Sequence, residues 1–100
     1  MVDLSKFKSF QWDKGNVDKS YEKHGITPNE SEEAFLDEKA IILRDIKHSD
    51  KEKRFSLISK TASNKLLFVV FTIRRKQIRV ISARRANKKE RSAYAKATAG

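Results

Sequence analysis

The residues of this 100-residue chain that are best suited to chemistry are its arginines and lysines, two histidines and Glu90, an acid set among basic residues. The sequence holds no glycine-rich phosphate loop, no cluster of His and acids at metal-ligand spacing and no Ser-His-Asp pattern. The remaining groups suit cleavage of RNA, which supplies its own nucleophile, the 2′-OH. A protein then has to orient that hydroxyl, move protons and stabilise phosphoryl charge, and arginine does the last through paired hydrogen bonds. We therefore expect neither a metal ion nor a cofactor.

The basic residues are concentrated near the C-terminus. Residues 74–100 hold 10 of the 23 basic side chains and one of the 13 acidic ones, which places +9 of the net charge of +10 in this segment. Such an asymmetry predicts a polyanionic partner. The alternatives are a solvated basic face that serves solubility, and a surface that serves only an acidic protein partner.

Three candidates for proton transfer each have a structural alternative. His24 ends a predicted helix, where the helix dipole stabilises a cation, so structural and catalytic roles are both open. His48 lies in a polar loop, where an ordinary surface role competes with catalysis. Glu90 follows Asn87 at capping-box spacing and is either a cap partner or a proton-transfer group.

The basic candidates surround the last predicted strand. Arg84 and Arg85 directly precede a helix start, where free amides and the helix dipole favour phosphate binding. Tyr94 either packs on the helix face or stacks on a base. The candidates for contacts with a nucleic-acid backbone are Arg74, Arg75, Lys88 and Lys89.

The pattern of apolar residues and turn signals predicts a single domain over residues 1–100, with 95–100 as a frayed tail. Its fold class is α+β: a small antiparallel β-sheet with two N-terminal helices and one C-terminal helix, the helices covering one sheet face and leaving the other free for a ligand. LLFVVFTI is apolar on both faces and predicts a central strand. The expected elements are a short strand at 8–12, helices at 13–24 and 27–37, strands at 40–46, 54–60, 66–73 and 77–83, and a helix capped by Asn87.

Side-chain alternation places two arginines on one sheet face. In the last strand, Arg79 is expected to share a face with Ile81 and Ala83. In RFSLIS, the core position of Leu57 points Arg54 the other way. If the strands pair antiparallel, Arg54 and Arg79 meet on the open face.

Four stretches occur in an order that resembles one family. FQWD, KHGIT, HSDKEKRF and RVISARRANKKERSAY, between Phe10 and Tyr94, are together similar to the BrnT family of bacterial toxins, which has a RelE-like ribonuclease fold. The resemblance implies a type II toxin that cleaves RNA, blocks translation and is held inactive by a cognate antitoxin. Such an antitoxin typically has a ribbon-helix-helix DNA-binding part, so contact with DNA is expected only through the antitoxin.

Carried over by position, the family motifs fall on residues already singled out. Our working hypothesis is that Arg54 and Arg84 stabilise phosphoryl charge while Glu90 or a histidine moves protons. The candidate catalytic residues are Lys23, His24, His48, Arg54, Arg84 and Glu90. The candidate RNA-binding residues are Arg74, Arg75, Arg79, Arg85, Lys88, Lys89, Arg91 and Tyr94.

Two further interpretations compete with a ribonuclease toxin. One is a non-catalytic RNA- or DNA-binding module that uses the same basic face, and the other is an interaction protein with an acidic partner. The chain has no cysteine, no signal-peptide pattern and no apolar run longer than Leu66–Phe71, so we expect a cytoplasmic protein without a membrane segment.

Overall fold

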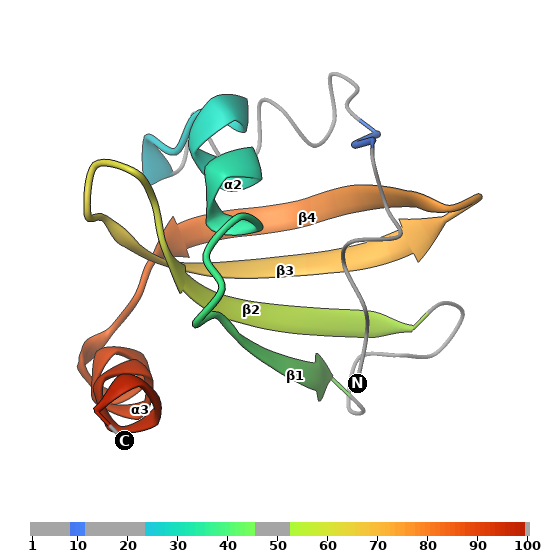
Figure 1. The fold of residues 1–100 in the computed structure, drawn as a ribbon. Coiled ribbons are helices and arrows are strands. Elements are labelled where there is room, and N and C mark those ends of the chain that lie inside the picture. The colour runs from blue at the N-terminus through green and yellow to red at the C-terminus, as the bar shows by residue number, and fades with distance from the viewer. Residues whose placement is uncertain (1–8, 12–23, 46–52, 100) are drawn as a thin grey trace.

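The computed structural model describes residues 9–11, 24–45 and 53–99. Four strands form one sheet in the order β1-β2-β3-β4, and every neighbouring pair is antiparallel. Figure 1 shows α2 over the sheet and α3 beyond one end of it. No helix in the described ranges is long and apolar enough to cross a membrane. The elements are α2 (Pro28–Ala34), β1 (Ile41–Asp45), β2 (Arg54–Lys60), β3 (Leu66–Arg74), β4 (Gln77–Arg85) and α3 (Lys88–Thr98).

The core lies between α2 and one face of the sheet, which we call the core face. Phe71 of β3, fully buried, is central to it. Its ring lies 4.9 Å from that of Phe35 and 5.5 Å from that of Phe55, centroid to centroid. Aromatic pairs at these distances add to the stabilisation that burial of their apolar surface provides. As predicted, β3 is central in the sheet, with β2 on one side and β4 on the other.

A β-bulge in β4 decides which arginines share a face. The register steps from Val70–Ser82 to Phe71–Val80, so Ile81 is an extra residue in β4. A bulge reverses the alternation of side chains beyond it. Ala83 is therefore buried on the core face, and the expectation that it shares a face with Arg79 is wrong.

The same bulge brings Arg84 onto the face that Arg79 occupies. Arg79 pairs with Thr72 and Arg84 pairs with Phe68, and these two β3 residues have the same parity. In a regular strand, positions 79 and 84 would point to opposite faces. Cross-strand partners share a face, so Arg79 and Arg84 both lie on the face away from the core, which we call the opposite face.

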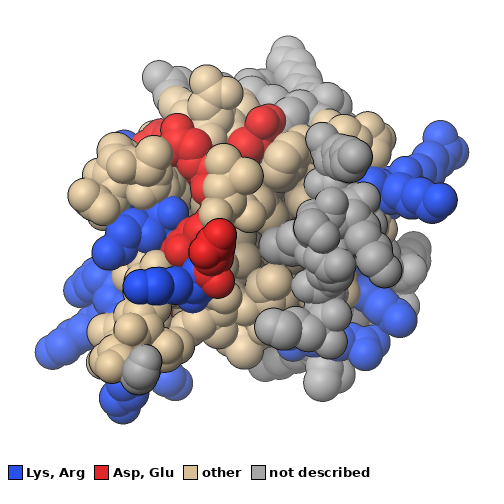
Figure 2. Space-filling view, in the orientation of Figure 1, with Lys and Arg blue, Asp and Glu red and all other residues tan. Residues whose placement is uncertain are grey.

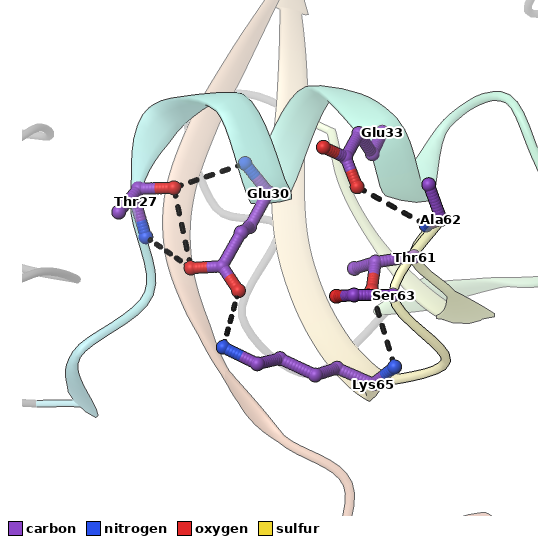
Figure 3. Close-up of polar contacts among 7 residues, drawn as sticks. All are labelled: Thr27, Glu30, Glu33, Thr61, Ala62, Ser63 and Lys65. Carbon is purple, nitrogen blue, oxygen red and sulfur yellow. Dashed lines mark hydrogen bonds and ion pairs between the residues drawn. The ribbon is translucent and has the colours of Figure 1, made fainter.

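α2 is fixed to the β2–β3 turn by acidic side chains, as Figure 3 shows. Thr27 and Glu30 form the predicted capping box, each side chain accepting the backbone N–H of the other residue. Glu30 also forms an ion pair with Lys65, and Oε1 of Glu33 accepts the Ala62 N–H at 3.1 Å. The pKa of Glu30 is lowered, first by the hydrogen bond from Lys65 and then by that from Thr27. These bonds orient the short helix over the core face.

α3 is held to the rest of the fold through Tyr94. The Tyr94 hydroxyl donates to Asp37 Oδ2 at 2.6 Å, and the same oxygen accepts the Lys60 N–H at 2.9 Å. Burial and the bond to Asp37 raise the pKa of Tyr94 to about 12. The predicted cap is present as well, since the Asn87 side chain and Glu90 each accept the other's backbone N–H.

The predicted set of helices is wrong. Within the described residues there are two helices, one short and mid-chain and one C-terminal, instead of two N-terminal helices and a C-terminal one. The first expected helix, 13–24, falls almost wholly on residues 12–23, outside the described part. α2 ends at Ala34 rather than near Asp37, since the amides of Phe35 and Leu36 donate to carbonyls three residues back, those of Glu32 and Glu33, and form a turn.

Three other expectations also change. Of the predicted first strand, Ser9–Gln11 is described and forms a single parallel bridge, Phe10 to Ile78 of β4. The opposite face is not open throughout, since Ile58 and Thr72 on this face are buried. α3 continues through Thr98, into the segment expected to fray.

Candidate functional site

Basic side chains form two clusters, one at each end of the sheet. The hairpin cluster consists of Arg54, Arg74, Arg75, Lys76 and Arg79, and the helix cluster of Arg84, Arg85, Lys88, Lys89 and Arg91. Figure 2 shows basic side chains projecting on opposite sides of the molecule, with acidic side chains between them. α2 and the residues directly after it hold five acids: Glu30, Glu32, Glu33, Asp37 and Glu38.

In the hairpin cluster, two arginines flank one buried threonine on the opposite face. Arg54 of β2 pairs with Thr72 of β3, and Thr72 pairs with Arg79 of β4. This register confirms that Arg54 and Arg79 share a face. Because adjacent strands are about 4.8 Å apart, their Cα atoms lie roughly 10 Å from each other. Two side chains of this length, half-buried at that spacing, can converge on one phosphate group.

The turn between β3 and β4 has an unusual backbone for its residue types. Arg75 and Lys76 have φ angles of 51° and 65°, in the left-handed region. Two-residue hairpin turns of this kind favour Asn-Gly or Asp-Gly, because other side chains are strained at positive φ. Backbone strain at an exposed basic turn motivates the hypothesis that this turn contacts a ligand. Lys76 was not among the predicted site residues; its place in a two-residue turn between strands was the available signal.

In the helix cluster, the most constrained arginine is bound by an acid. Arg84 donates from both terminal nitrogens to the two carboxylate oxygens of Glu90, each at 2.8 Å. Its guanidinium carbon also lies 4.4 Å from the ring centroid of Phe68, and Nη1 reaches the Arg85 carbonyl at 3.1 Å. The two terminal nitrogens of Arg84, which could each bind one oxygen of a phosphate, thus already bind the Glu90 carboxylate.

The Glu90 carboxylate lies at the N-terminus of α3, where the free backbone amides of a helix bind anions. Its Oε1 accepts the Asn87 N–H at 2.8 Å in addition to the bond from Arg84. Partial burial tends to raise the pKa of Glu90, but the hydrogen bonds from Arg84 and Asn87 and the charge of Arg84 outweigh it and lower the pKa. A carboxylate with a lowered pKa is a weak proton acceptor at neutral pH.

The candidate catalytic residues that the structure describes do not all lie together. Arg84 and Glu90 are in contact, but Arg84 pairs with Phe68, four β3 residues from the Thr72 that separates Arg54 and Arg79. At 3.3 Å per residue this is roughly 13 Å along the strand. His24 is exposed and immediately precedes the Gly25–Thr27 segment that leads into α2. Lys23 and His48 lie outside the described residues, so their roles stay predictions.

The remaining candidates differ in exposure. Arg85, Lys88 and Lys89 are exposed around the start of α3, where phosphate groups bind well. Arg91 is exposed too, but donates to the Ala86 carbonyl at 2.9 Å. Tyr94 is buried and its hydroxyl is bound to Asp37, so it packs α3 against the fold. The sequence gives no signal for the role of Asp37, because an acid after a helix is common. Its carboxylate accepts hydrogen bonds from two backbone amides and from the distant Tyr94 hydroxyl, and neither kind of donor is visible as a sequence motif.

Within the described ranges, no three His, Cys, Asp or Glu side chains are grouped so that they could hold a metal ion. In a comparison with family models, residues 12–90 match the model described as "Ribonuclease toxin, BrnT, of type II toxin-antitoxin system". The match spans well over half of the chain, including both arginines of the hairpin cluster that flank Thr72 and the Arg84–Glu90 pair. No curated protein matches the sequence.

Proposed function

The chain belongs to the BrnT family of type II toxin–antitoxin ribonuclease toxins, and from that premise we propose that it is an endoribonuclease that cuts RNA without a metal ion. In the proposed reaction the 2′-OH attacks the adjacent phosphorus, and the bond to the 5′ oxygen breaks. The products are a 2′,3′-cyclic phosphate and a 5′-hydroxyl, and one proton passes from the nucleophile to the leaving oxygen through catalytic groups. Blocked translation follows from the loss of RNA.

We place the scissile phosphate at the hairpin cluster. The observation that carries this assignment is the register that sets Arg54 and Arg79 on the opposite face, on either side of Thr72. Two guanidinium groups at one phosphate stabilise the charge that develops on its oxygens. The strained Arg75–Lys76 turn adds positive charge next to this pair and would attract the neighbouring backbone phosphates.

The helix cluster has a supporting role in this proposal. Arg85, Lys88 and Lys89 are exposed and would bind RNA backbone without regard to sequence. Arg84 is then a positioning residue, because its bonds to Glu90 and its stacking on Phe68 fix the start of α3 relative to the sheet. This revises the working hypothesis, which gave Arg84 a direct contact with the phosphate.

Proton transfer is assigned to His48 in preference to Glu90. Glu90 has a lowered pKa and is bound to Arg84, whereas an imidazole titrates near neutral pH and suits both proton donation and acceptance. His48 precedes Arg54 by six residues in the sequence. A His48→Gln variant is expected to lose the acid or base limb of the pH–rate profile while binding RNA normally.

The partner implied by the family is a cognate antitoxin. We propose that it is a ribbon-helix-helix DNA-binding protein and that it keeps the toxin inactive in the complex. Contact of this chain with DNA would then occur only through the antitoxin.

The test is cleavage of a labelled RNA by the purified chain in the presence of a chelator. We expect cleavage that survives chelation, products with 2′,3′-cyclic phosphate ends, and protection when the antitoxin is added. The Arg54→Ala/Arg79→Ala variant is the inactive control for a contaminating nuclease. Cleavage that stops on chelation, or that this variant retains in full, contradicts the proposed mechanism.

A second candidate function is an RNA-binding module without catalysis. It is favoured by one observation: the proton-transfer candidate Glu90 binds Arg84, which pairs with Phe68, four β3 residues from the Thr72 that separates Arg54 and Arg79. Tight binding of RNA with intact RNA after long incubation would support this module over the ribonuclease.

A further inference from the structure

An exposed leucine separates two grooves on the side of the molecule that carries α2. Leu36 is 80 % exposed, more than any other large hydrophobic side chain in the described ranges. It lines one groove of about 290 Å³ together with Lys60 and Tyr94. It also lines a second groove of about 310 Å³ together with Phe10 and Asn29. The proposed RNA contacts use none of these residues.

The local structure holds Leu36 outward. Phe35, directly before it, packs its ring against those of Phe10 and Phe71, at 5.3 Å and 4.9 Å between centroids. The Leu36 N–H donates to the Glu33 carbonyl at 3.0 Å, which fixes the turn after α2. A large apolar side chain that is held in water between two grooves is typical of a surface that binds another protein.

The charge around Leu36 indicates the chemistry of that partner. Glu33 and Leu36 both line each groove, while Asp37 lines the first and Glu32 the second. Three donors hold the Asp37 carboxylate: the Tyr94 hydroxyl and the amides of Lys39 and Lys60.

Glu33 is the acid that remains available to a cation. Figure 3 shows Glu33 Oε1 bound to the Ala62 N–H, and its second oxygen has no hydrogen bond to any described residue. An apolar side chain beside a carboxylate complements a hydrophobic residue that has Lys or Arg next to it. The same acids repel RNA, so this surface does not extend the RNA-binding face.

We propose that the surface around Glu33 and Leu36, the leucine groove, binds a segment of the cognate antitoxin that carries an apolar side chain next to a lysine or arginine. This inference rests on the proposed function for the identity of the partner. Leu36 follows α2, on the core side of the sheet, whereas Arg54 and Arg79 lie on the opposite face. The contact therefore supplies affinity, and a different part of the antitoxin covers the RNA-binding residues.

The test is the affinity between the full chain and the protein encoded next to its gene, measured by calorimetry. Leu36→Ala is expected to weaken binding at least tenfold, and Glu33→Gln by about fivefold, because central anchors carry most of the energy of an interface. Glu33→Gln keeps an acceptor for the Ala62 N–H. The matched controls are Leu43→Ala, at the other exposed leucine, and Glu38→Gln, an exposed acid outside both grooves; both should bind within about twofold of the unchanged chain.

A readout of RNA cleavage separates this inference from the proposed function. The Leu36→Ala toxin is expected to cut RNA at the normal rate and to escape protection by the antitoxin at concentrations that silence the unchanged chain. If Leu36→Ala binds the antitoxin within twofold of the unchanged chain, the proposed antitoxin contact at the leucine groove is wrong, even if RNA cleavage is normal. A Leu36→Ala effect confined to self-association of the chain overturns it as well, because the occupant is then a second copy. An unchanged chain that binds the antitoxin but does not cut RNA contradicts only the proposed function.

Discussion

The hairpin cluster and the helix cluster hold similar residues and are built in different ways. In the helix cluster, Arg84 is bound by both oxygens of Glu90 and lies on the ring of Phe68, so positive charge fixes a helix to the sheet. In the hairpin cluster, Arg75 and Lys76 have positive φ angles, so the backbone is strained at a turn that exposes positive charge. Density of basic residues alone therefore does not identify the RNA-binding site, because an arginine such as Arg84 can serve to hold a helix in place.

The largest effect is expected from removing the arginines on either side of Thr72. Arg54→Ala combined with Arg79→Ala should reduce RNA cleavage by about 100-fold or more, because both groups would stabilise charge in the transition state. The matched control is Lys88→Ala with Lys89→Ala, two charges removed from the helix cluster. A larger loss of activity in this control would reverse the assignment of the two clusters.

The second effect concerns stability at the helix cluster. Arg84→Ala should lower the free energy of unfolding by roughly 1–2 kcal/mol, because it leaves the half-buried Glu90 carboxylate without its charged partner. Chemical denaturation measures this change, and a double-mutant cycle with Glu90→Gln isolates the coupling. Coupling near zero, together with a complete loss of RNA cleavage, would show that Arg84 acts on the phosphate and not through Glu90.

The third effect concerns the turn of the hairpin cluster. Replacing Arg75-Lys76 by Asn-Gly should stabilise the protein by about 1 kcal/mol, since these residues fit a turn with two positive φ angles. The same change should weaken RNA binding several-fold and reduce its dependence on salt, because two charges are lost. Thermal unfolding and filter binding check the two parts. Unchanged RNA affinity would remove this turn from the binding surface.

The smallest effect is a dependence of stability on acidic pH. The folded-state pKa of Glu90 is lowered from its ordinary 4.5, mainly through Arg84 and Asn87. Its contribution is therefore present above that ordinary pKa and is lost as pH falls through the lowered value. Glu90→Gln should slightly reduce the loss of unfolding free energy as the pH is lowered. The pH dependence that remains is expected from Glu30 and Asp37, whose pKa values are also lowered. An acid limb that does not change in Glu90→Gln would contradict this account of the pair.

Local signals in the sequence predicted local structure well. The capping pairs Thr27–Glu30 and Asn87–Glu90 are both present, because capping depends on residues three apart. β2 begins and ends at the predicted residues, and β3 is central. These features depend on side chains that are neighbours in the sequence, so tertiary packing does not have to be known.

Features set by contacts between distant residues were not predictable. The extra residue Ile81 in β4 has no sequence signal of its own, yet it places Arg84 on the same face as Arg79. Asp37, just after α2, was not expected in a structural role, and its carboxylate binds groups of β2 and α3 that follow it by 23 and 57 residues. The family motifs indicated which residues belong to the site, but the register was needed to separate them into two clusters.

The central claim is that RNA phosphate is bound by Arg54 and Arg79 rather than by Arg84. The most direct measurement is the side-chain Nε–H resonance of each arginine during titration with a 2′-O-methyl RNA, which cannot be cleaved. We predict saturable shifts for Arg54 and Arg79 and an unchanged signal for Arg84, held by Glu90. A shift at Arg84 with Arg54 and Arg79 unaffected would contradict the account.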